Sequence, residues 1–320
     1  LSVWLQGSEA FIDLPRGYAQ VYLNSPLRQQ EVDAAVMMVL WSDLYGLQQT
    51  ALINEASIAG MGLSLGLDEG LRLSISGFTD KQPELLSAAL AGLRVNPDQQ
   101  ALDQAIDRFV RGLENRKREL PFRQLGRTLS SLTRTGFFDE ASLLDAVAEV
   151  TPTRFNAFVE RVLDGALVRA YLFGNYDEAF ANDLAQTLQS ALPEERAGAT
   201  EYARERVYAP VPGQTLVKNR DVPVEDLGMM LLYAAPEATV ANEATGRVLA
   251  RHLRNRAFDT LRTEEQLGYA AGGLTTTLQD HPMIGFYIQT PVKGPVAMLE
   301  RFEAFADEYA LMLDELTEGQ

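Results

Sequence analysis

The feature of this sequence that most constrains its fold is an internal repeat. Each half starts with an alternating apolar strand, continues with a long helix and a short helical piece ending in glycine, and then gives two strands and a helix. Gly60 and Gly268 lie 208 positions apart (268 − 60). Leu23 and Leu231, in the first strands, lie equally far apart (231 − 23). Unrelated domains would rarely share this spacing, so the sequence predicts two copies of one α+β unit.

The periodicity of apolar residues predicts the elements of each copy. In the first copy we expect strands at 10–25, 61–67, 71–78 and 166–173, and helices at 31–48, 50–59, 79–93, 99–119, 121–135, 141–150, 152–163 and 177–192. In the second we expect strands at 226–235, 269–276 and 283–290, and helices at 243–268 and 295–316. Thr79 and Thr151 are the expected N-caps of their helices.

These elements predict an α+β fold of two homologous units, each an antiparallel sheet covered by helices. A polar, proline-containing stretch at 193–212 is the expected linker, which divides the chain into units 1–204 and 205–320. The second copy lacks a counterpart of residues 94–204, so we expect that unit to be truncated and its sheet to have an unpaired edge. The start at Leu1, without Met or a signal-peptide pattern, likewise indicates a cut inside a longer protein.

The charge balance argues against two classes of partner. A formal charge of −16 and a pI near 4.6 do not suit nucleic acid or an anionic membrane, because both require clustered Lys and Arg. The most basic run, 108–123, is interrupted by Glu114 and Glu119 and is typical of a solvated helix face. No apolar run approaches the roughly 20 residues of a membrane span. The oligomeric state is not indicated by the sequence.

Few residues suited to catalysis are present. Cysteine is absent, which excludes disulfides, thiolate catalysis and Cys-ligated zinc. The two histidines, His252 and His281, belong to neither H-x-x-E-H nor H-E-x-x-H, so we expect no metal site in this chain. No G-x-S-x-G elbow and no phosphate-binding loop occur, although a Ser/His/Asp triad stays open because triads assemble in space. The chain alone does not have the pattern of a complete enzyme.

The stretch 253–274 carries the most distinctive pair of side chains. It is predicted as a helix that is capped by Gly268, because glycine takes the left-handed cap conformation without strain. Arg262 and Tyr269 stand seven positions apart across this cap and can lean over the same helix end. One interpretation is an exposed arginine paired with Glu265 or Gln266, beside a half-buried strand tyrosine. The other is a functional pair.

The repeat helps to choose between these interpretations. Subtracting 208 from the positions of the pair leads to Asn54 and Met61, so only the second copy carries Arg and Tyr. A difference between two otherwise similar copies favours the functional interpretation.

The run 258–273, FDTLRTEEQLGYAAGG, closely resembles a signature in the C-terminal half of the insulinase/pitrilysin family of zinc metallopeptidases. Three stretches of the first copy resemble the same family's middle domain, namely WLQGSEAFIDLPRGYAQVYLNSP at 4–26, ASIAGMGLSL at 56–65 and GLRLSISGFTDKQ at 70–82. The resemblance implies an enzyme of two bowls, each made of two homologous α+β units. This chain would be the third unit and part of the fourth.

The resemblance also implies roles for particular residues. Zinc and the catalytic Glu would belong to an H-x-x-E-H helix in the N-terminal half, so no residue here is assigned to them. Arg262 and Tyr269 match the Arg and Tyr that reach the substrate across the closed chamber. A guanidinium or phenol O–H there stabilises the charge on the attacked carbonyl oxygen more in the transition state than in the ground state. Gln266 and Leu267 are expected to be structural.

We therefore expect the C-terminal half of a zinc metalloendopeptidase that acts on peptides together with its N-terminal half, and that is inactive alone. One alternative is a non-catalytic scaffold subunit, although such a subunit needs neither Arg262 nor Tyr269. Another is a peptidase that matures the precursor peptide of the quinone cofactor PQQ. The first hypothesis favours the periplasm, and PQQ maturation favours the cytoplasm.

Overall fold

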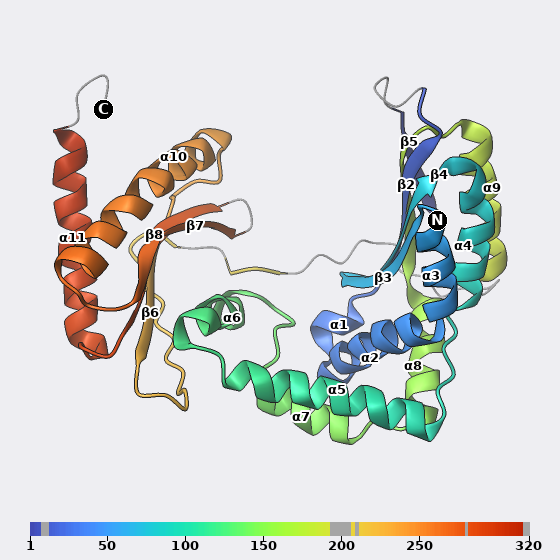
Figure 1. The fold of residues 1–320 in the computed structure, drawn as a ribbon, viewed down its shortest axis with the longest axis horizontal. Coiled ribbons are helices and arrows are strands. Elements are labelled where there is room, and N and C mark those ends of the chain that lie inside the picture. The colour runs from blue at the N-terminus through green and yellow to red at the C-terminus, as the bar shows by residue number, and fades with distance from the viewer. Residues whose placement is uncertain (8–12, 193–205, 209–210, 279–280, 316–320) are drawn as a thin grey trace. The chain divides into compact units, whose positions relative to one another are not determined.

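The computed structural model describes residues 1–7, 13–192, 206–208, 211–278 and 281–315 (Figure 1). They form two compact units. Unit 1 consists of Leu1–Leu113 and Thr135–Glu205, and unit 2 of Glu114–Arg134 and Arg206–Gln320. Each unit combines a β-sheet with covering helices, which confirms the predicted α+β class.

Unit 1 contains a five-stranded sheet in the order β1-β5-β2-β4-β3. Neighbouring strands are antiparallel except for β1, which is parallel to β5. The strands are β1 (Ser2–Gln6), β2 (Arg16–Asn24), β3 (Gly62–Asp68), β4 (Gly70–Phe78) and β5 (Leu167–Gly174). The helices are α1 (Leu27–Gln30), α2 (Val32–Gln48), α3 (Thr50–Ile58), α4 (Gln82–Ala91), α5 (Gln99–Lys117, whose end belongs to unit 2), α7 (Glu140–Ala148), α8 (Pro152–Gly165) and α9 (Glu178–Ala191).

One face of this sheet is apolar because the strand sequences alternate. In β4, Leu71, Leu73 and Ile75 are buried, whereas Arg72 and Ser74 between them point to the opposite face. Helices α4 and α9 cover the apolar face (Figure 1), and the core continues into α2 through the fully buried side chain of Trp41. Burial of these apolar side chains is the main force that holds unit 1 together.

The predicted elements of unit 1 occur in the structure, with four local differences. Helix α1 was not predicted, because it is only four residues long and none of them is buried. Strand β1 was not predicted, because four of its five residues are exposed and its pattern lacks an apolar face. The predicted N-cap at Thr79 is wrong: Thr79–Lys81 forms a 3₁₀ turn, and α4 begins at Gln82 without a side-chain cap. The predicted strand 10–25 begins only at Arg16, and its residues 10–12 lie outside the described residues. The N-cap at Thr151 is confirmed by a 3.3 Å hydrogen bond from the Arg154 amide.

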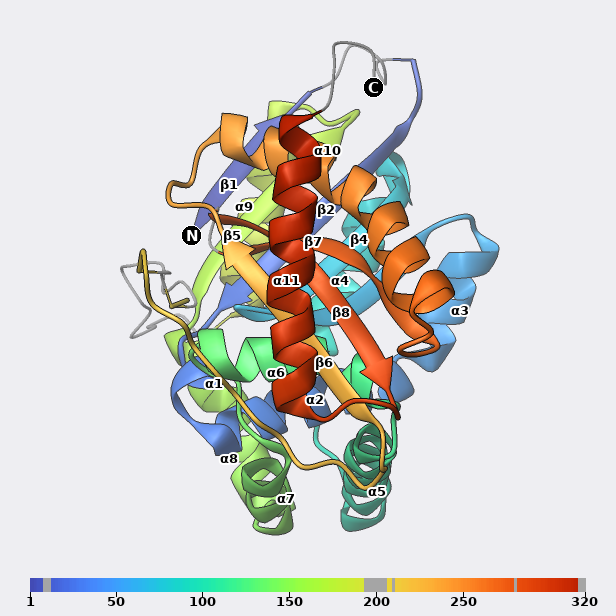
Figure 2. The ribbon, with the colours of Figure 1, turned by 90° about the vertical axis from the view of Figure 1, so that its left-hand side faces the viewer.

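Unit 2 contains a smaller antiparallel sheet in the order β6-β8-β7. The elements are β6 (Leu227–Ala234), β7 (Ala270–Leu278), β8 (His281–Thr290), α10 (Val240–Ala257), α11 (Pro295–Asp314), the π-helix η3 (Phe258–Glu264) and α6 (Pro121–Thr133). Helix α10 packs on β7 and β8, and α11 packs against β6, which it crosses obliquely (Figure 2). In the described part of unit 2, no strand pairs with the outer edge of β6, which matches the predicted unpaired edge.

Helix α6 belongs to the first half of the sequence but packs in unit 2. The ring of Phe122 stacks on Tyr287 of β8, with centroids 6.3 Å apart, and Pro121 lies against Gly228 of β6. The compact units therefore differ from a single cut between residues 204 and 205, because residues 114–134 group with the second unit. Sequence periodicity identified this helix but could not indicate which sheet it covers.

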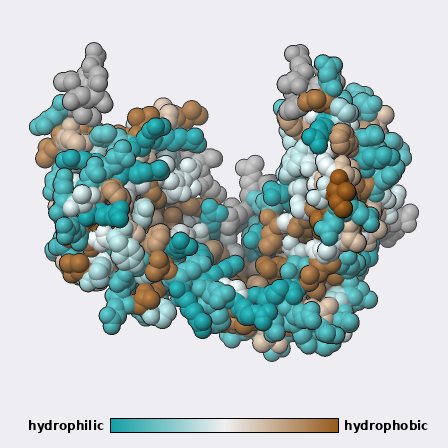
Figure 3. All heavy atoms as spheres, viewed as in Figure 1, coloured by the Kyte–Doolittle hydropathy of each residue, from teal (hydrophilic) through white to brown (hydrophobic). Residues whose placement is uncertain are grey.

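The surface is mixed in character. On the face shown in Figure 3, hydrophobic residues form small separate groups among hydrophilic ones. Among the described residues, the helices are all too short or too polar to cross a membrane.

The β3–β4 turn offers a first test. Gly70 has φ +143°, and a Cβ there would lie 2.0 Å from the Leu23 carbonyl oxygen. We expect Gly70→Ala to lower the free energy of unfolding by about 1–3 kcal/mol, because alanine is strained at this φ and its Cβ would collide with the Leu23 carbonyl oxygen. The matched control is Gly66→Ala in β3, where nothing lies within 4 Å of the new Cβ. Urea denaturation should show a smaller effect for Gly66→Ala; equal losses would contradict the assignment.

Candidate functional site

The predicted pair lies at the end of α10, where the helix changes geometry. Residues 258–264 form a π-helix, which is rare and is frequently found at functional sites. The predicted cap at Gly268 is wrong, because the helix ends at Glu264 and the residue with left-handed backbone is Gln266, with φ 53°. Gly268 is required for a different reason: a Cβ there would lie 2.0 Å from the Gln289 carbonyl oxygen. It lets the chain approach β8 as it enters β7.

This local geometry also changes the alignment of the two copies. In the first copy, the left-handed residue after α3 is Gly60, with φ 72°, so its counterpart is Gln266, 206 positions later (266 − 60). The two predicted cap glycines are therefore not equivalent. With this offset, Tyr269 corresponds to the buried Leu63, and α3 contains no arginine. The finding that only the second copy carries the pair is unchanged.

Tyr269 is held at its phenol oxygen by two polar side chains. The residue is 50% exposed, and its O–H donates to Asp226 Oδ2 at 3.1 Å. The amide nitrogen of Gln289 donates to the same carboxylate oxygen at 2.8 Å and also to the phenol oxygen. Desolvation, followed by the hydrogen bond and charge of Asp226, raises the pKa of Tyr269 above its ordinary value. The phenol is therefore protonated, oriented and open to solvent.

Arg262 is exposed and is placed by an aromatic contact. Its guanidinium lies 4.6 Å from the centroid of the Phe258 ring, one turn earlier in the π-helix. Among the described residues, no carboxylate forms an ion pair with Arg262, so the pairing with Glu265 considered from the sequence does not occur. Within the described residues, no hydrogen bond joins the side chains of Arg262 and Tyr269. Both are nevertheless polar groups available to a ligand.

Glu265 instead fixes the end of the π-helix to α11. Arg301 contacts both of its carboxylate oxygens, the shortest contact being 2.6 Å, and also pairs with Glu308 at 3.1 Å. The Arg301 side chain is only 15% exposed, and its hydrogen bonds to Glu265 raise the pKa of the guanidinium. A cavity of about 280 Å³ beside this cluster is lined by Thr260, Glu264 and Tyr309, among others. The ion pair anchors the residues that carry Arg262.

The histidines serve structural contacts. His252 Nδ1 lies 2.9 Å from the Tyr309 hydroxyl, and His281 Nδ1 lies 3.4 Å from the Ala235 carbonyl oxygen. Among the described residues, no group of three His, Cys, Asp or Glu side chains could hold a metal ion. The donors present therefore do not fit a catalytic zinc site, which typically takes three protein ligands.

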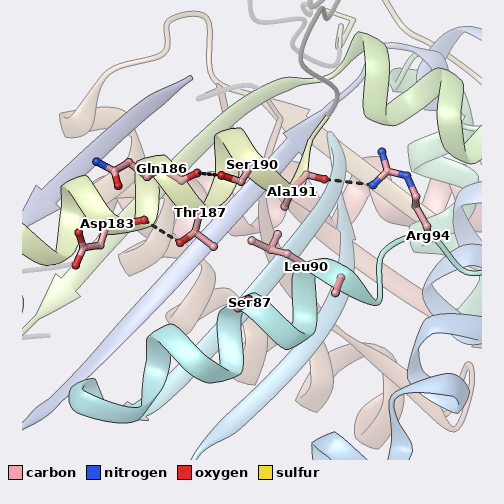
Figure 4. Close-up of a pocket in the computed structure, with 9 residues that line it drawn as sticks. Ser87, Leu90, Arg94, Asp183, Gln186, Thr187, Ser190 and Ala191 are labelled. Atoms are coloured by element: carbon pink, nitrogen blue, oxygen red, sulfur yellow. Dashed lines mark hydrogen bonds between the residues drawn. The ribbon is translucent and has the colours of Figure 1, made fainter.

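A larger groove, of about 690 Å³, lies in unit 1 between α4 and α9 (Figure 4). Thr187 and Ser190 donate to carbonyl groups of their own helix, and Arg94 donates to the Ala191 carbonyl and to Glu160. These three side chains thus have partners within the protein. The groove does not contain either residue of the predicted pair.

Three residues of this region, Asp226, Gln289 and Arg301, were not predicted from the sequence. Asp226 and Gln289 stand 43 and 20 positions from Tyr269, and only strand pairing brings them together. The available signal was the polar Gln289 after the largely apolar run 282–288, because a polar side chain is costly to bury without partners.

The chain matches two known domain models. Residues 1–146 match the middle or third domain of peptidase M16, and residues 248–320 match the PQQ synthase PqqF-like C-terminal lobe domain 4. Among curated proteins, Protease 3 of Escherichia coli strain K12 is 24% identical over 300 residues, which is 93% of this chain and 31% of that protein. Insulin-degrading enzyme of Drosophila melanogaster is 25% identical over 289 residues, 88% and 29% respectively. The chain thus spans about a third of the length of these relatives.

Solved structures share the fold. Pitrilysin superposes with a TM-score of 0.87 at 24% identity, covering 98% of this chain and 34% of pitrilysin. A peptidase M16 inactive domain from Pseudomonas fluorescens superposes with a TM-score of 0.66 at 17% identity, covering 96% of this chain and 76% of that one.

The anchoring role of Arg301 can be measured. We expect Arg301→Lys to lower the free energy of unfolding of unit 2 by about 1–3 kcal/mol, because lysine cannot form the bidentate pair with Glu265. The matched control is Arg247→Lys, whose side chain is 72% exposed in an i,i+4 pair with Glu243 and should change stability by about 0.5 kcal/mol or less. Urea denaturation in which both variants behave alike would contradict this role.

Proposed function

Since the chain belongs to the insulinase/pitrilysin family of peptidases and corresponds to its C-terminal half, we propose that it contacts the peptide substrate of such an enzyme through Arg262 and Tyr269. The observation that carries this proposal is the exposed phenol of Tyr269, held by Asp226 and Gln289. Arg262 supports it, because its guanidinium is exposed and stacked on Phe258. Two hydrogen-bond donors on one short segment are suited to bind the carbonyl oxygen of a peptide.

The chemistry of peptide hydrolysis explains why these residue types would be needed. Attack on a peptide carbonyl builds negative charge on its oxygen. A guanidinium or a phenol O–H held nearby stabilises that charge more strongly in the transition state than in the ground state. Since the described residues offer no metal cluster, we assign zinc and the attacking water to the N-terminal half of the whole protein. We propose that the two halves enclose the peptide between them, and that the protein acts in the periplasm.

A second candidate function is favoured by one observation. The C-terminal residues 248–320, which include both Arg262 and Tyr269, match a PQQ synthase PqqF-like domain. The substrate would then be the precursor peptide of PQQ, and a cytoplasmic location would follow. Cleavage of that precursor by the whole protein, at a rate well above that for unrelated peptides of equal length, would favour this function over general peptide degradation.

The principal test concerns the two donors in the whole protein. We expect Tyr269→Phe or Arg262→Ala to reduce kcat for peptide hydrolysis by about 10²–10³-fold, because each removes one group that stabilises the oxyanion. Stability should change little, since both side chains are exposed. The measurement is steady-state hydrolysis of a fluorogenic peptide, together with a melting curve for each variant.

Two matched controls belong to this test. Tyr233→Phe alters another exposed tyrosine of unit 2, and Arg247→Ala alters an exposed arginine in the neighbouring helix α10. Both should keep full activity. If the Tyr269→Phe, Arg262→Ala double variant were as active as the unchanged protein, the substrate-contact proposal would fail and the scaffold alternative would gain support.

The metal assignment gives a separate prediction for the purified chain of residues 1–320. After dialysis against zinc and then against buffer, we expect far less than one zinc ion per chain by atomic emission, and no peptide hydrolysis. One tightly bound zinc per chain would contradict the assignment of zinc to the other half.

A further inference from the structure

The side chain of Gln289 is almost completely buried, although it is polar. It is 1% exposed, in β8, at the face of the sheet that α6 covers. Its amide oxygen accepts a hydrogen bond from the backbone N–H of Phe122 at 3.4 Å, and its amide nitrogen donates to Asp226 at 2.8 Å. A buried amide with partners on both sides has a single favourable orientation.

The orientation of this amide is determined by groups that cannot change role. The Phe122 N–H can only donate, so the amide oxygen must face α6. The carboxylate of Asp226 can only accept, so the amide nitrogen must face Asp226 and the phenol of Tyr269. The phenol oxygen therefore accepts from Gln289, and its single proton is directed to Asp226 at 3.1 Å.

The beginning of α6 is itself held firmly against the sheet. Pro121 lies so close to Gly228 of β6 that a Cβ there would be 2.6 Å from the proline Cβ. Phe122 stacks on Tyr287, two residues before Gln289. The donor that orients Gln289 is thus fixed by packing on two strands.

We propose that Gln289 and Asp226 are positioning residues for Tyr269, and that the first turn of α6 sets their arrangement through the Phe122 amide. The inference rests on the proposed contact between Tyr269 and a peptide substrate. A bound peptide carbonyl takes the place of Asp226 as acceptor of the phenol proton, while Gln289 keeps the phenol oxygen in place. Residues 121–122, far from Tyr269 in the sequence, thereby contribute to the site.

The proposal is tested in the whole protein by a double-mutant cycle. Gln289→Met keeps the side-chain length but removes both hydrogen-bonding atoms. We expect it to lower kcat/KM about tenfold or more when Tyr269 is present, with most of the loss in kcat. The reason is that a phenol O–H held out of position stabilises the transition state less well. In the Tyr269→Phe background the same change should cost less than about twofold. Equal losses in both backgrounds would overturn the proposal.

A second measurement does not depend on activity. Ultraviolet difference titration, with the Tyr269→Phe protein as reference, reports the pKa of Tyr269 alone. We expect Asp226→Asn to lower this pKa toward the ordinary value of tyrosine, because the negative acceptor of the phenol proton is removed. An unchanged pKa would overturn the proposed hydrogen-bond arrangement. The exposed Tyr233→Phe variant should leave the Tyr269 titration unaltered.

The two readouts separate the two proposals. If Tyr269→Phe leaves peptide hydrolysis unchanged, the substrate-contact function fails, and the titration alone decides whether Asp226 and Gln289 orient the phenol. If Tyr269→Phe impairs hydrolysis but the cycle is additive, the function stands and the positioning role of Gln289 is wrong. A melting curve for Gln289→Met shows whether any loss reflects unfolding, in which case the Asp226→Asn titration decides.

Discussion

The buried amide of Gln289 is the interaction on which the arrangement of unit 2 depends. It bonds α6 on one side and Asp226 and Tyr269 on the other. Its backbone carbonyl faces Gly268, where only glycine leaves room for the chain entering β7. One residue of β8 therefore touches three segments that are distant in sequence. A polar side chain at 1% exposure is costly unless every partner is in place, so these segments must be assembled together.

This dependence explains why α6 groups with unit 2. Its first turn supplies a backbone donor and an aromatic ring to the sheet face that α10 and α11 leave uncovered. A sheet whose two faces are both partly apolar needs helices or loops over each face. Among the described residues of the second copy, no helix after α11 could cover this face. The helix from the first half of the chain fills that place.

Sequence patterns predicted most of the fold, because strand alternation and helical periodicity follow directly from which face is buried. They failed where tertiary contacts decide. Strand β1 is exposed and has no pattern, and the side on which α6 packs is set by Phe122 and Tyr287. The expectation that a glycine caps the helix placed its end wrongly. Gln266 adopts the left-handed conformation, whereas Gly268 is needed because the backbone passes close to the Gln289 carbonyl. The motif singles out Arg262 and Tyr269, but the partners of Tyr269, Asp226 and Gln289, come near it only through strand pairing.

The two copies differ in backbone geometry at this helix end. In the first copy, the regular helix α3 ends at Ile58, Gly60 takes the left-handed conformation, and the chain enters β3 with a buried Leu63. In the second, a π-helix accommodates the turn, Gln266 takes the strained conformation, and the position of Leu63 holds an exposed tyrosine. Backbone strain of about 1–3 kcal/mol persists only where the surroundings impose it. Here Arg301 holds Glu265 beside the strained residue, and its 15% exposure makes that ion pair hard to replace with solvent. The ion pair of Arg301 and the exposed side chains of Arg262 and Tyr269 therefore lie at the same helix end, where the two copies differ.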